Sequence, residues 1–397
     1  MSPDLMKADI AIVGGGLVGA SLALALQAGA RQRGWRIVLV EPYPPGEGYQ
    51  PSYDARSSAL SFGSRRIYER LGVWSAIEQR AQPITHIHVS DRGRFGAARL
   101  DAADEGVPAL GYVVENAWIG HCLWQALDQD VIHWCAPAEV TGASPTESGY
   151  QLTLGDGTTL DASLVVLADG GRSSLRDQLG IEAKRTVYDQ HALIANVTTR
   201  EPHGGQAFER FSKHGPMALL PLADNRSALV WTRPPADAHR LQGCAEQLFL
   251  SELQQAFGYR LGAFTQVGAR YVYPLELVES TEQVRAHLVV LGNAAHSLHP
   301  VAGQGFNLSL RDTQVLAEVL LGDDAGPGAF TTLQHYYARQ RQDQQLTVGF
   351  SHHLTQLFTR RESAVIAGRN LGLLALDLLP PAKHWFARQA MGLGTRG

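Results

Sequence analysis

A glycine-rich turn between an apolar strand and an apolar helix restricts the fold of this chain more than any other feature. The turn follows the strand-like run 9–13 and has the pattern GxGxxG. In such a turn the first glycine allows the bend, the second lets backbone approach a diphosphate, and the third lets the helix pack closely. The residues expected to contact the nucleotide are Gly14, Gly16, Leu17, Val18 and Gly19. The pattern predicts a Rossmann-like βαβ unit.

An acidic residue supports this prediction. Glu41 lies 22 residues after Gly19, at the end of a second apolar run, 36–41. A carboxylate at this position accepts hydrogen bonds from ribose hydroxyls and repels a 2′-phosphate, so FAD or NAD fits better than NADP. The alternative to nucleotide binding is that the glycine-rich turn has only a structural role.

Two later segments also follow buried strands. Asp169 and Gly170 follow the apolar run 163–168, and the segment 293–307 lies between the strand-like run 287–291 and a helix that begins near residue 305. Backbone N–H groups at a helix start stabilise negative charge, as a reduced flavin carries at its pyrimidine end. The candidate cofactor contacts are Asn293, Gly303, Gln304, Gly305, Phe306 and Asn307. The alternative is an ordinary capped helix after a loop.

The middle of the chain differs from the first part. Short strand-like runs recur between 187 and 282, at 192–197, 217–220, 228–231 and 270–273, separated by turn residues. This pattern indicates a second domain built on antiparallel sheet. Beyond about residue 330 the chain is expected to be helical.

Composition excludes several classes of protein. The net charge is −4 and no block of Lys and Arg occurs, which argues against binding to nucleic acid. Cys122, Cys135 and Cys244 form no CxxC pair, so we expect neither disulfides nor a metal site. The N-terminus lacks the order of a signal peptide, which favours the cytoplasm. One GxGxxG pattern implies that a nicotinamide cofactor binds without a Rossmann domain of its own.

Taken together, these motifs resemble the class A flavoprotein aromatic monooxygenases, which include p-hydroxybenzoate hydroxylase, over roughly residues 9–330. Asn293 is a departure, because the family usually has an aspartate that bonds the ribityl chain. Segments 54–61, 111–116, 292–295 and 303–308 look like the ubiquinone-biosynthesis hydroxylases. His299-Pro300 and the run 369–373 are most similar to the 2-polyprenyl-6-methoxyphenol hydroxylase branch.

The resemblance implies an α/β fold. A Rossmann-like FAD-binding domain of three layers, with a mostly parallel sheet, would comprise residues 1–75, 105–182 and 286–330. An inserted antiparallel-sheet substrate domain would comprise 76–104 and 183–285, and a helical region 331–397. Arg56 and Asn116 would join the cofactor contacts, although an isolated Arg in a polar loop is more often a solvated ion-pair partner.

It also implies a reaction. NADPH, favoured over NADH, would reduce FAD, and a C4a-hydroperoxide of the flavin would hydroxylate a prenylated phenol, 2-polyprenyl-6-methoxyphenol, to the corresponding benzoquinol. Catalysis would be centred on the flavin; Pro300 would shape the ring pocket, and His296 and His299 are weak candidates for proton transfer. A hydroxylase of soluble small aromatics, a flavin oxidase or dehydrogenase, and a non-catalytic flavin-binding protein remain alternatives.

The C-terminal region has its own charge pattern. Residues 359–397 contain six basic and two acidic residues among many leucines. This composition suits a peripheral contact with an anionic membrane, the inner membrane face, or a groove on a protein of the ubiquinone pathway. A helix packed on the enzyme's own surface is the alternative. Asp377 and Pro380-Pro381 argue against a spanning helix.

Overall fold

The predicted strand–turn–helix is present at the N-terminus. The structure is a computed structural model that describes residues 5–43, 56–171, 173–360 and 362–393. The unit consists of β1 (Leu5–Val13), α1 (Leu17–Arg33) and β2 (Ile37–Val40). Ile10 and Ile12 of β1 face one hydrophobic core and Ala11 and Val13 the other. An apolar strand of this kind is typical of a parallel sheet covered on both faces.

The sheet around β1, here called the parallel-rich sheet, joins distant parts of the chain. Its strand order is β18–β19–β11–β1–β2–β8, and the β9–β10 hairpin lies beside β11. Strands β8, β2, β1, β11 and β19 are parallel. The further strands are β8 (Ile132–Cys135), β9 (Val140–Thr146), β10 (Gly149–Leu154), β11 (Thr159–Leu167), β18 (Val284–Arg285) and β19 (Leu288–Val290).

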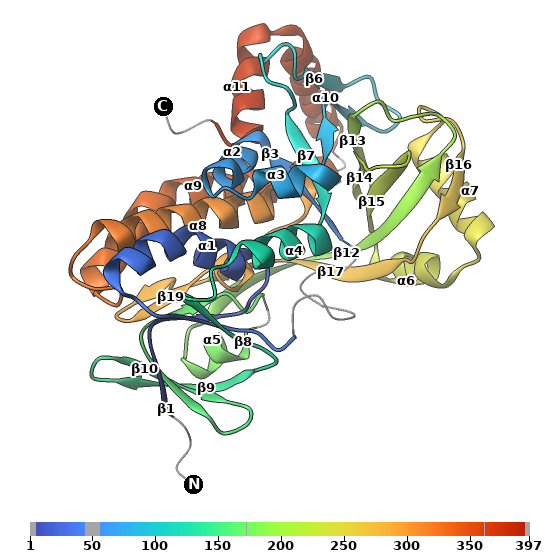
Figure 1. The fold of residues 1–397 in the computed structure, drawn as a ribbon. Coiled ribbons are helices and arrows are strands. Elements are labelled where there is room, and N and C mark those ends of the chain that lie inside the picture. Colours follow the sequence, from blue (N-terminus) through green and yellow to red (C-terminus); the bar gives the residue numbers. More distant parts are fainter. Residues whose placement is uncertain (1–4, 44–55, 172, 361, 394–397) are drawn as a thin grey trace.

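The parallel-rich sheet is the middle one of three layers (Figure 1). Helices α1, α8 (Gln304–Gly322) and α9 (Phe330–Thr359) cover one face, where Leu26, Leu316 and Leu333 share a core. The β9–β10 hairpin and α5 (Ser174–Gln178) cover the other face. The predicted α/β class is confirmed.

A second sheet, here called the large sheet, is almost wholly antiparallel. Its order is β20–β17–β12–β15–β14–β13–β5–β6, with β16 beside β12; only the β13–β5 pair is parallel among these neighbours. The four predicted strand-like runs lie in or overlap its strands. Its elements are β5 (His86–Asp91), β6 (Ala97–Asp101), β12 (Ala183–Thr199), β13 (Gln206–Ser212), β14 (Gly215–Pro221), β15 (Arg226–Arg233), β16 (Phe264–Val267), β17 (Tyr271–Ser280) and β20 (His296–Ser297).

Two helices cover the outer face of the large sheet and were not predicted. They are α6 (Pro235–Gly243) and α7 (Glu246–Phe257). Phe249 and Leu253 of α7 pack with Leu229 and Trp231 of the sheet. Pro235 stands in the first turn of α6, where a missing N–H is tolerated. The chain between β15 and β16 is therefore partly helical.

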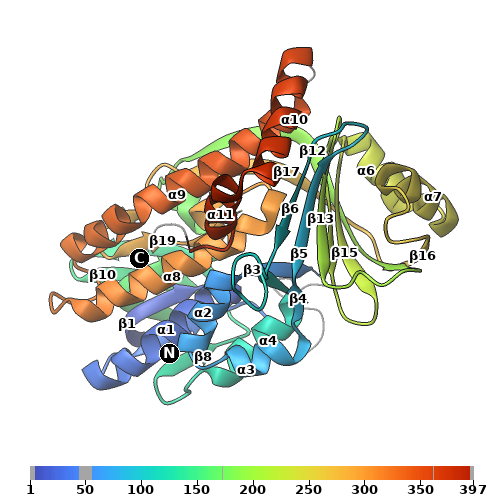
Figure 2. The same cartoon turned by 90° about the horizontal axis from the view of Figure 1, so that it is seen from above.

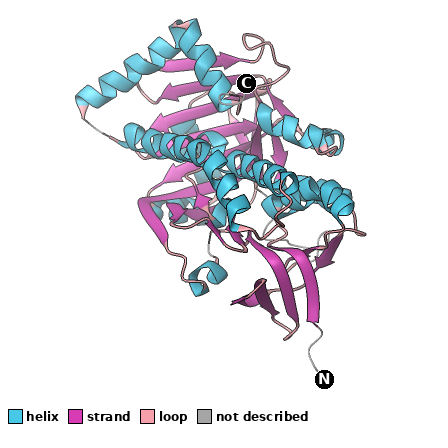
Figure 3. Cartoon of the chain, turned by 90° about the vertical axis from the view of Figure 1, so that its left-hand side faces the viewer, coloured by secondary structure: helices cyan, strands magenta, loops and turns pink. Residues whose placement is uncertain are grey.

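The remaining elements lie between and above the two sheets. Figure 3 shows the strands in two groups with helices across the middle. The elements are β3 (Ser57–Ser61), α2 (Phe62–Arg70), α3 (Trp74–Ile77), η2 (Glu78–Arg80), β4 (Gln82–Ile84), β7 (Gly111–Glu115), α4 (Asn116–Ala126), η3 (Gly292–Ala294), η4 (Val301–Gly303), α10 (Ser363–Leu378) and α11 (Pro380–Ala390).

The C-terminal region is helical, as predicted. Helices α10 and α11 lie at one end of the molecule (Figure 1), and α10 projects in the view from above (Figure 2). Within the described residues no single helix is long and apolar enough to cross a membrane; α10 and α11 pass that test only as a pair, and the pair is bent by 97°.

Candidate active site

A cavity of about 1470 Å³ lies between the parallel-rich sheet, the large sheet and the C-terminal helices. Of the predicted site residues, only Gly19 and His296 are absent from its walls. The structure therefore brings together residues that are up to about 290 positions apart in the sequence.

Steric space explains the glycine-rich turn. Gly14 has a φ of 103°, and a Cβ there would stand 2.5 Å from the carbonyl oxygen of Ala168. A Cβ on Gly19 would stand 1.9 Å from the carbonyl oxygen of Gly14, so Gly19 serves helix packing, not the cavity wall. Glu41 is buried, and its Oε2 accepts a hydrogen bond from the Gly15 N–H at 2.7 Å.

Asp169 and Gly170 form the cavity wall after β11. The Asp169 side chain is open to the cavity, yet desolvation by the surrounding protein raises the pKa of its carboxyl, an effect that a hydrogen bond with Ser173 opposes. Nearby, the buried Arg176 donates from Nη1 to the Ala294 carbonyl at 3.0 Å. This contact, which the sequence did not reveal, fixes the segment after β11 to the segment after β19.

The segment 293–307 passes through the end of η3, the short strand β20 and the turn η4 before it enters α8. Gly303 has a φ of 60°, and a Cβ there would meet the Ala59 Cβ at 3.2 Å. A Cβ on Gly305 would make only an ordinary contact, at 3.9 Å from Leu298. The backbone conformation and the contact with Ala59 therefore favour glycine at position 303. Nothing in the protein requires glycine at position 305, and the close approach of a ligand there stays a prediction.

Asn307 holds this segment against β3. Its Oδ1 accepts from the Ser61 N–H at 2.8 Å and the Ser64 hydroxyl at 2.6 Å. Its Nδ2 donates to the carbonyls of Ala59 at 2.8 Å and Gly303 at 2.7 Å. Because the amide makes four bonds within the protein, Asn307 positions the start of α8, and only its backbone is left to contact a ligand.

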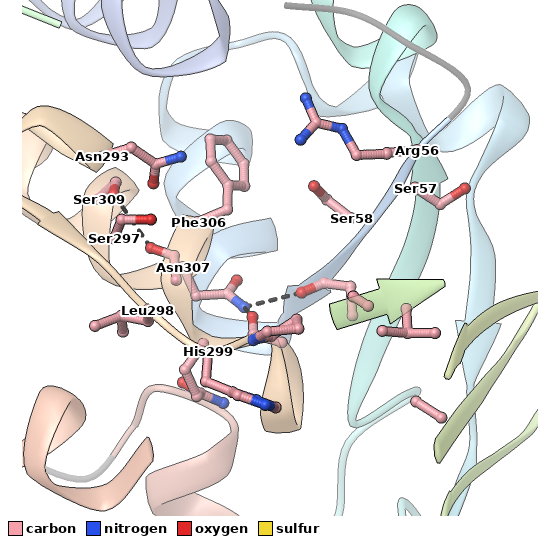
Figure 4. A pocket seen from close by; sticks show the side chains of 18 of the residues that line it. Arg56, Ser57, Ser58, Asn293, Ser297, Leu298, His299, Phe306, Asn307 and Ser309 are labelled. Atoms are coloured by element: carbon pink, nitrogen blue, oxygen red, sulfur yellow. Dashed lines mark hydrogen bonds between the residues drawn. The ribbon is translucent and has the colours of Figure 1, made fainter. Parts of the chain in front are cut away.

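Arg56 lies across the cavity from Asn293 and Phe306 (Figure 4), and Asn116 also lines the cavity. The Asn116 N–H donates to the Arg56 carbonyl at 2.9 Å, and the Ser58 hydroxyl donates to Asn116 Oδ1 at 2.7 Å. The Arg56 guanidinium lies 5.4 Å from the centre of the Tyr273 ring. Arg56 therefore lines the cavity and is not a fully solvated residue of a polar loop.

The two candidate histidines have different surroundings. His296 does not line the cavity; its Nε2 lies 2.7 Å from Oδ2 of the fully buried Asp312, which also accepts from Gln340 and Gln344. His299 does line the cavity, and burial lowers its pKa to about 4. Its Nδ1 accepts from the Val301 N–H at 3.2 Å, so the neutral ring carries its proton on Nε2.

Burial of histidine predicts acid-sensitive stability. Burial also lowers the pKa of His88 to about 4, with a further contribution from Arg260. Between the ordinary pKa of histidine and this value, the unfolded chain binds more protons than the folded chain. The free energy of unfolding should therefore fall as pH drops from about 6.5 to about 4, with about 1–3 kcal/mol lost through His299.

Urea unfolding across this pH range checks the prediction. His299→Asn should flatten the pH dependence, whereas the same change at the exposed His133 should leave it as in the wild type. Equal slopes for His299→Asn and the wild type would contradict it.

Apolar strands form the second part of the cavity. Residues of β14 alternate between the two faces of the large sheet: Ala218 and Leu220 line the cavity, while Met217 and Leu219 pack under α7. The period of two along a strand explains this division of β14. Phe208 and Phe211 of β13 also line the cavity. Ile87, Val89, Leu100 and Val230 extend the wall.

The third part of the cavity wall is formed by the C-terminal helices. The sequence did not predict that these helices line the cavity. Phe358 of α9 stacks on Phe211 at 3.5 Å between ring centres. Gly368 and Gly372 of α10 line the cavity and are also exposed, so the cavity opens along α10. The other apolar residues of this wall are Phe350, Leu354, Leu357, Leu373, Leu376, Phe386 and Ala390.

Comparison with known proteins agrees with this site. A family model described as FAD binding domain matches residues 7–351. The chain is 37% identical to ubiquinone hydroxylase UbiL of Rhodospirillum rubrum, covering 97% of this chain and 90% of that protein. It is 32% identical to 3-demethoxyubiquinol 3-hydroxylase of Escherichia coli (97% and 98%) and 29% identical to the human ubiquinone biosynthesis monooxygenase COQ6, mitochondrial (95% and 91%).

Solved structures share the fold. The p-nitrophenol 4-monooxygenase PnpA of Pseudomonas putida superposes with a TM-score of 0.78 at 18% identity, and the match covers 99% of this chain and 100% of that chain. PqsL of Pseudomonas aeruginosa gives 0.76 at 21% identity, with coverage of 93% and 99%. The chain is thus a class A FAD-dependent monooxygenase with FAD as its cofactor. Within that class, it belongs to the family of ubiquinone-biosynthesis hydroxylases.

Proposed function

We propose that this enzyme hydroxylates a prenylated phenol, 2-polyprenyl-6-methoxyphenol, with molecular oxygen and NAD(P)H, of which NADPH is favoured. The observation that supports this most is the continuous cavity, which runs from the glycine-rich turn to a mouth on α10 and is predominantly apolar over its second and third parts. A soluble aromatic compound would need no such extension, whereas a polyprenyl tail needs an apolar path over its whole length.

The first part of the cavity fits FAD. The open backbone at Gly14 and Gly16 and the N-terminus of α1 suit the diphosphate, and Glu41 suits the ribose. Bound FAD supplies the redox chemistry that activates oxygen. We assign the further contacts to Leu17, Val18, Arg56, Asn116, Asp169, Gly170, Asn293, Gly303, Gln304, Gly305, Phe306 and the backbone of Asn307.

The chain's own groups would prepare the reaction. N–H groups at the start of α8 stabilise negative charge. Pro300 and His299 border the space beside the large sheet, where the phenol ring would lie. The apolar strands exclude water, which protects reactive species from solvent. Asparagine at 293 accepts from a hydroxyl without adding a charge.

The strands of the two sheets follow the proposed division of the chain except at its second junction, where β18 belongs to the parallel-rich sheet and β20 to the large sheet. We assign residues 1–75, 105–182 and 286–330 to the FAD-binding domain, 76–104 and 183–285 to the substrate domain, and 331–397 to the helical region. The exposed apolar surface of α10 and α11 supports a peripheral place at the inner membrane face.

A bulky substitution at the mouth of the cavity should weaken the binding of substrates with long prenyl tails more than the binding of those with short tails. A Cβ on Gly372 would meet nothing within 4 Å, so tryptophan there can extend into the mouth without disturbing the helix. Gly372→Trp is expected to raise the KM for a long-chain prenylated phenol by about tenfold, and progressively less as the tail shortens. Gly349→Trp is the matched control, since this α9 glycine also has free space but does not line the cavity. An effect independent of tail length would contradict the proposal.

The function itself is tested by following NADPH oxidation by the purified holoenzyme, with labelled oxygen and a short-chain 2-prenyl-6-methoxyphenol. One labelled atom in the product ring supports the proposal. Peroxide formation without product would overturn this substrate, and hydroxylation only of water-soluble phenols would favour the soluble-aromatic alternative.

A further inference from the structure

Large apolar side chains are exposed at the end of the molecule where α10 and α11 lie. Phe95 at the β5–β6 turn is 65% exposed, Leu378 of α10 is 66% and Trp385 of α11 is 65%. We define the docking surface as these residues and their exposed apolar neighbours: Phe95, Leu371, Leu374, Leu378, Leu379 and Trp385. Exposed apolar groups in this number mark an interaction site.

Helix α10 has two apolar stripes. Leu371, Leu374 and Leu378 follow helical spacing and are exposed. Gly372 and Leu376 lie on the stripe that lines the cavity. The mouth of the cavity therefore opens beside the docking surface, and an apolar path leads from one into the other.

Specific bonds hold the segments of this surface together. The Gly96 N–H donates to Asn370 Oδ1 at 2.8 Å, and a Cβ on Gly96 would stand 2.5 Å from that oxygen. Asn370 Nδ2 and Arg369 Nε both donate to the buried Asp91, at 3.0 and 2.8 Å. Arg99 binds Asp377 of α10 through its N–H and its Nη1, both at 2.8 Å. The β5–β6 turn and α10 thus form one built surface.

Charges at its border favour an anionic partner. The carboxylates of Asp91 and Asp377 bind arginines, and Asp104 lies 3.5 Å from Lys383. The Glu105 carboxylate is 2.9 Å from His384, and Glu362 is exposed. Basic residues exposed around the same surface are Arg94, Arg360 and Arg388. Arg94 and Arg388 form no ion pair with any residue that the structure describes.

We propose that the docking surface binds an anionic lipid bilayer, with the cavity mouth against the lipid. Leucines and a tryptophan ringed by arginines are the composition of a helix that lies in the membrane interface. The bend of 97° lets α10 and α11 lie on the bilayer without crossing it. The role of this membrane contact rests on the proposed function. With the mouth against the bilayer, a prenylated substrate could pass from the lipid into the cavity without meeting water.

Vesicle co-sedimentation of the holoenzyme tests the proposal. The wild type should bind phosphatidylglycerol vesicles, and phosphatidylcholine vesicles less. The double variant Leu374→Glu with Leu378→Glu should bind phosphatidylglycerol at least about tenfold more weakly. Arg94→Glu should weaken binding by about fivefold or more. The matched controls are Leu248→Glu on α7, where the leucine is 49% exposed, and Lys184→Glu, and both should bind as the wild type does.

Three results would overturn the docking surface. The first is a wild type that ignores anionic vesicles while it hydroxylates a soluble short-chain phenol, and the second is equal losses in the patch and control variants. The third is a patch variant that only splits a dimer in solution, which would assign the surface to a second copy. Vesicle binding without any hydroxylation would instead sink the proposed function and leave the docking surface in place.

Discussion

Gly14→Ala is expected to yield a protein that has lost most of its FAD. The new Cβ would stand 2.5 Å from the carbonyl oxygen of Ala168, and the φ of 103° disfavours alanine. Strain and overpacking together should cost about 2–4 kcal/mol, which weakens FAD binding more than about 30-fold. The neighbouring segment with Asp169 and Gly170 would have to move, and it too borders the cofactor part of the cavity.

Gly34→Ala supplies the matched control. Gly34 also has a positive φ, 67°, but a Cβ there would meet nothing within 4 Å. This change should cost only about 1 kcal/mol of folding stability and leave FAD binding unchanged. The flavin-to-protein absorbance ratio and a fluorescence titration with FAD measure both variants. Equal FAD affinity in the two would show that the turn does not approach the cofactor.

The largest loss of folding stability is expected from Asp312→Leu. Asp312 is fully buried and accepts hydrogen bonds from His296, Gln340 and Gln344, which joins α8 to α9 and to the segment after β19. Leucine would remove the buried acceptor that these three donors share, at a cost of about 3–5 kcal/mol in the free energy of unfolding.

Two comparisons sharpen this prediction. Asp312→Asn keeps one acceptor oxygen and should cost clearly less than Asp312→Leu. Glu318→Gln removes an exposed ion pair with Arg339, at 2.9 Å, and should cost about 0–1 kcal/mol. Urea unfolding at neutral pH measures all three. Similar losses for Asp312→Leu and Glu318→Gln would refute the structural role of the buried network.

The sequence predicted those parts of the site whose signal is local. The turn around Gly14, the carboxylate of Glu41 and the segment 293–307 each combine a strand end with the residues that follow it. Such motifs depend on backbone geometry over a few residues, so they can be recognised without knowledge of the fold. The α/β class followed from the same motifs and from the family resemblance.

Contacts between distant residues could not be predicted in this way. Arg176 and Ala294 are far apart in sequence, and nothing local to either shows that they bind each other. Helix α10 is apolar on two stripes, so its composition alone does not tell which stripe faces the cavity. By contrast, Phe249, Leu253 and Phe257 of α7 follow helical spacing, and this helix could have been found.

The strand order of the parallel-rich sheet bears on how the protein is made. β1 lies beside β11, and β11 lies beside β19, so this sheet closes only after residue 290 has been synthesised. At about 5–20 residues per second, a ribosome needs roughly 15–60 s to reach that point. Throughout this interval the apolar faces of β1 and β2 lack part of their cover. We therefore expect the nascent chain to depend on chaperones and to give more correctly folded enzyme when translation is slowed by a low growth temperature.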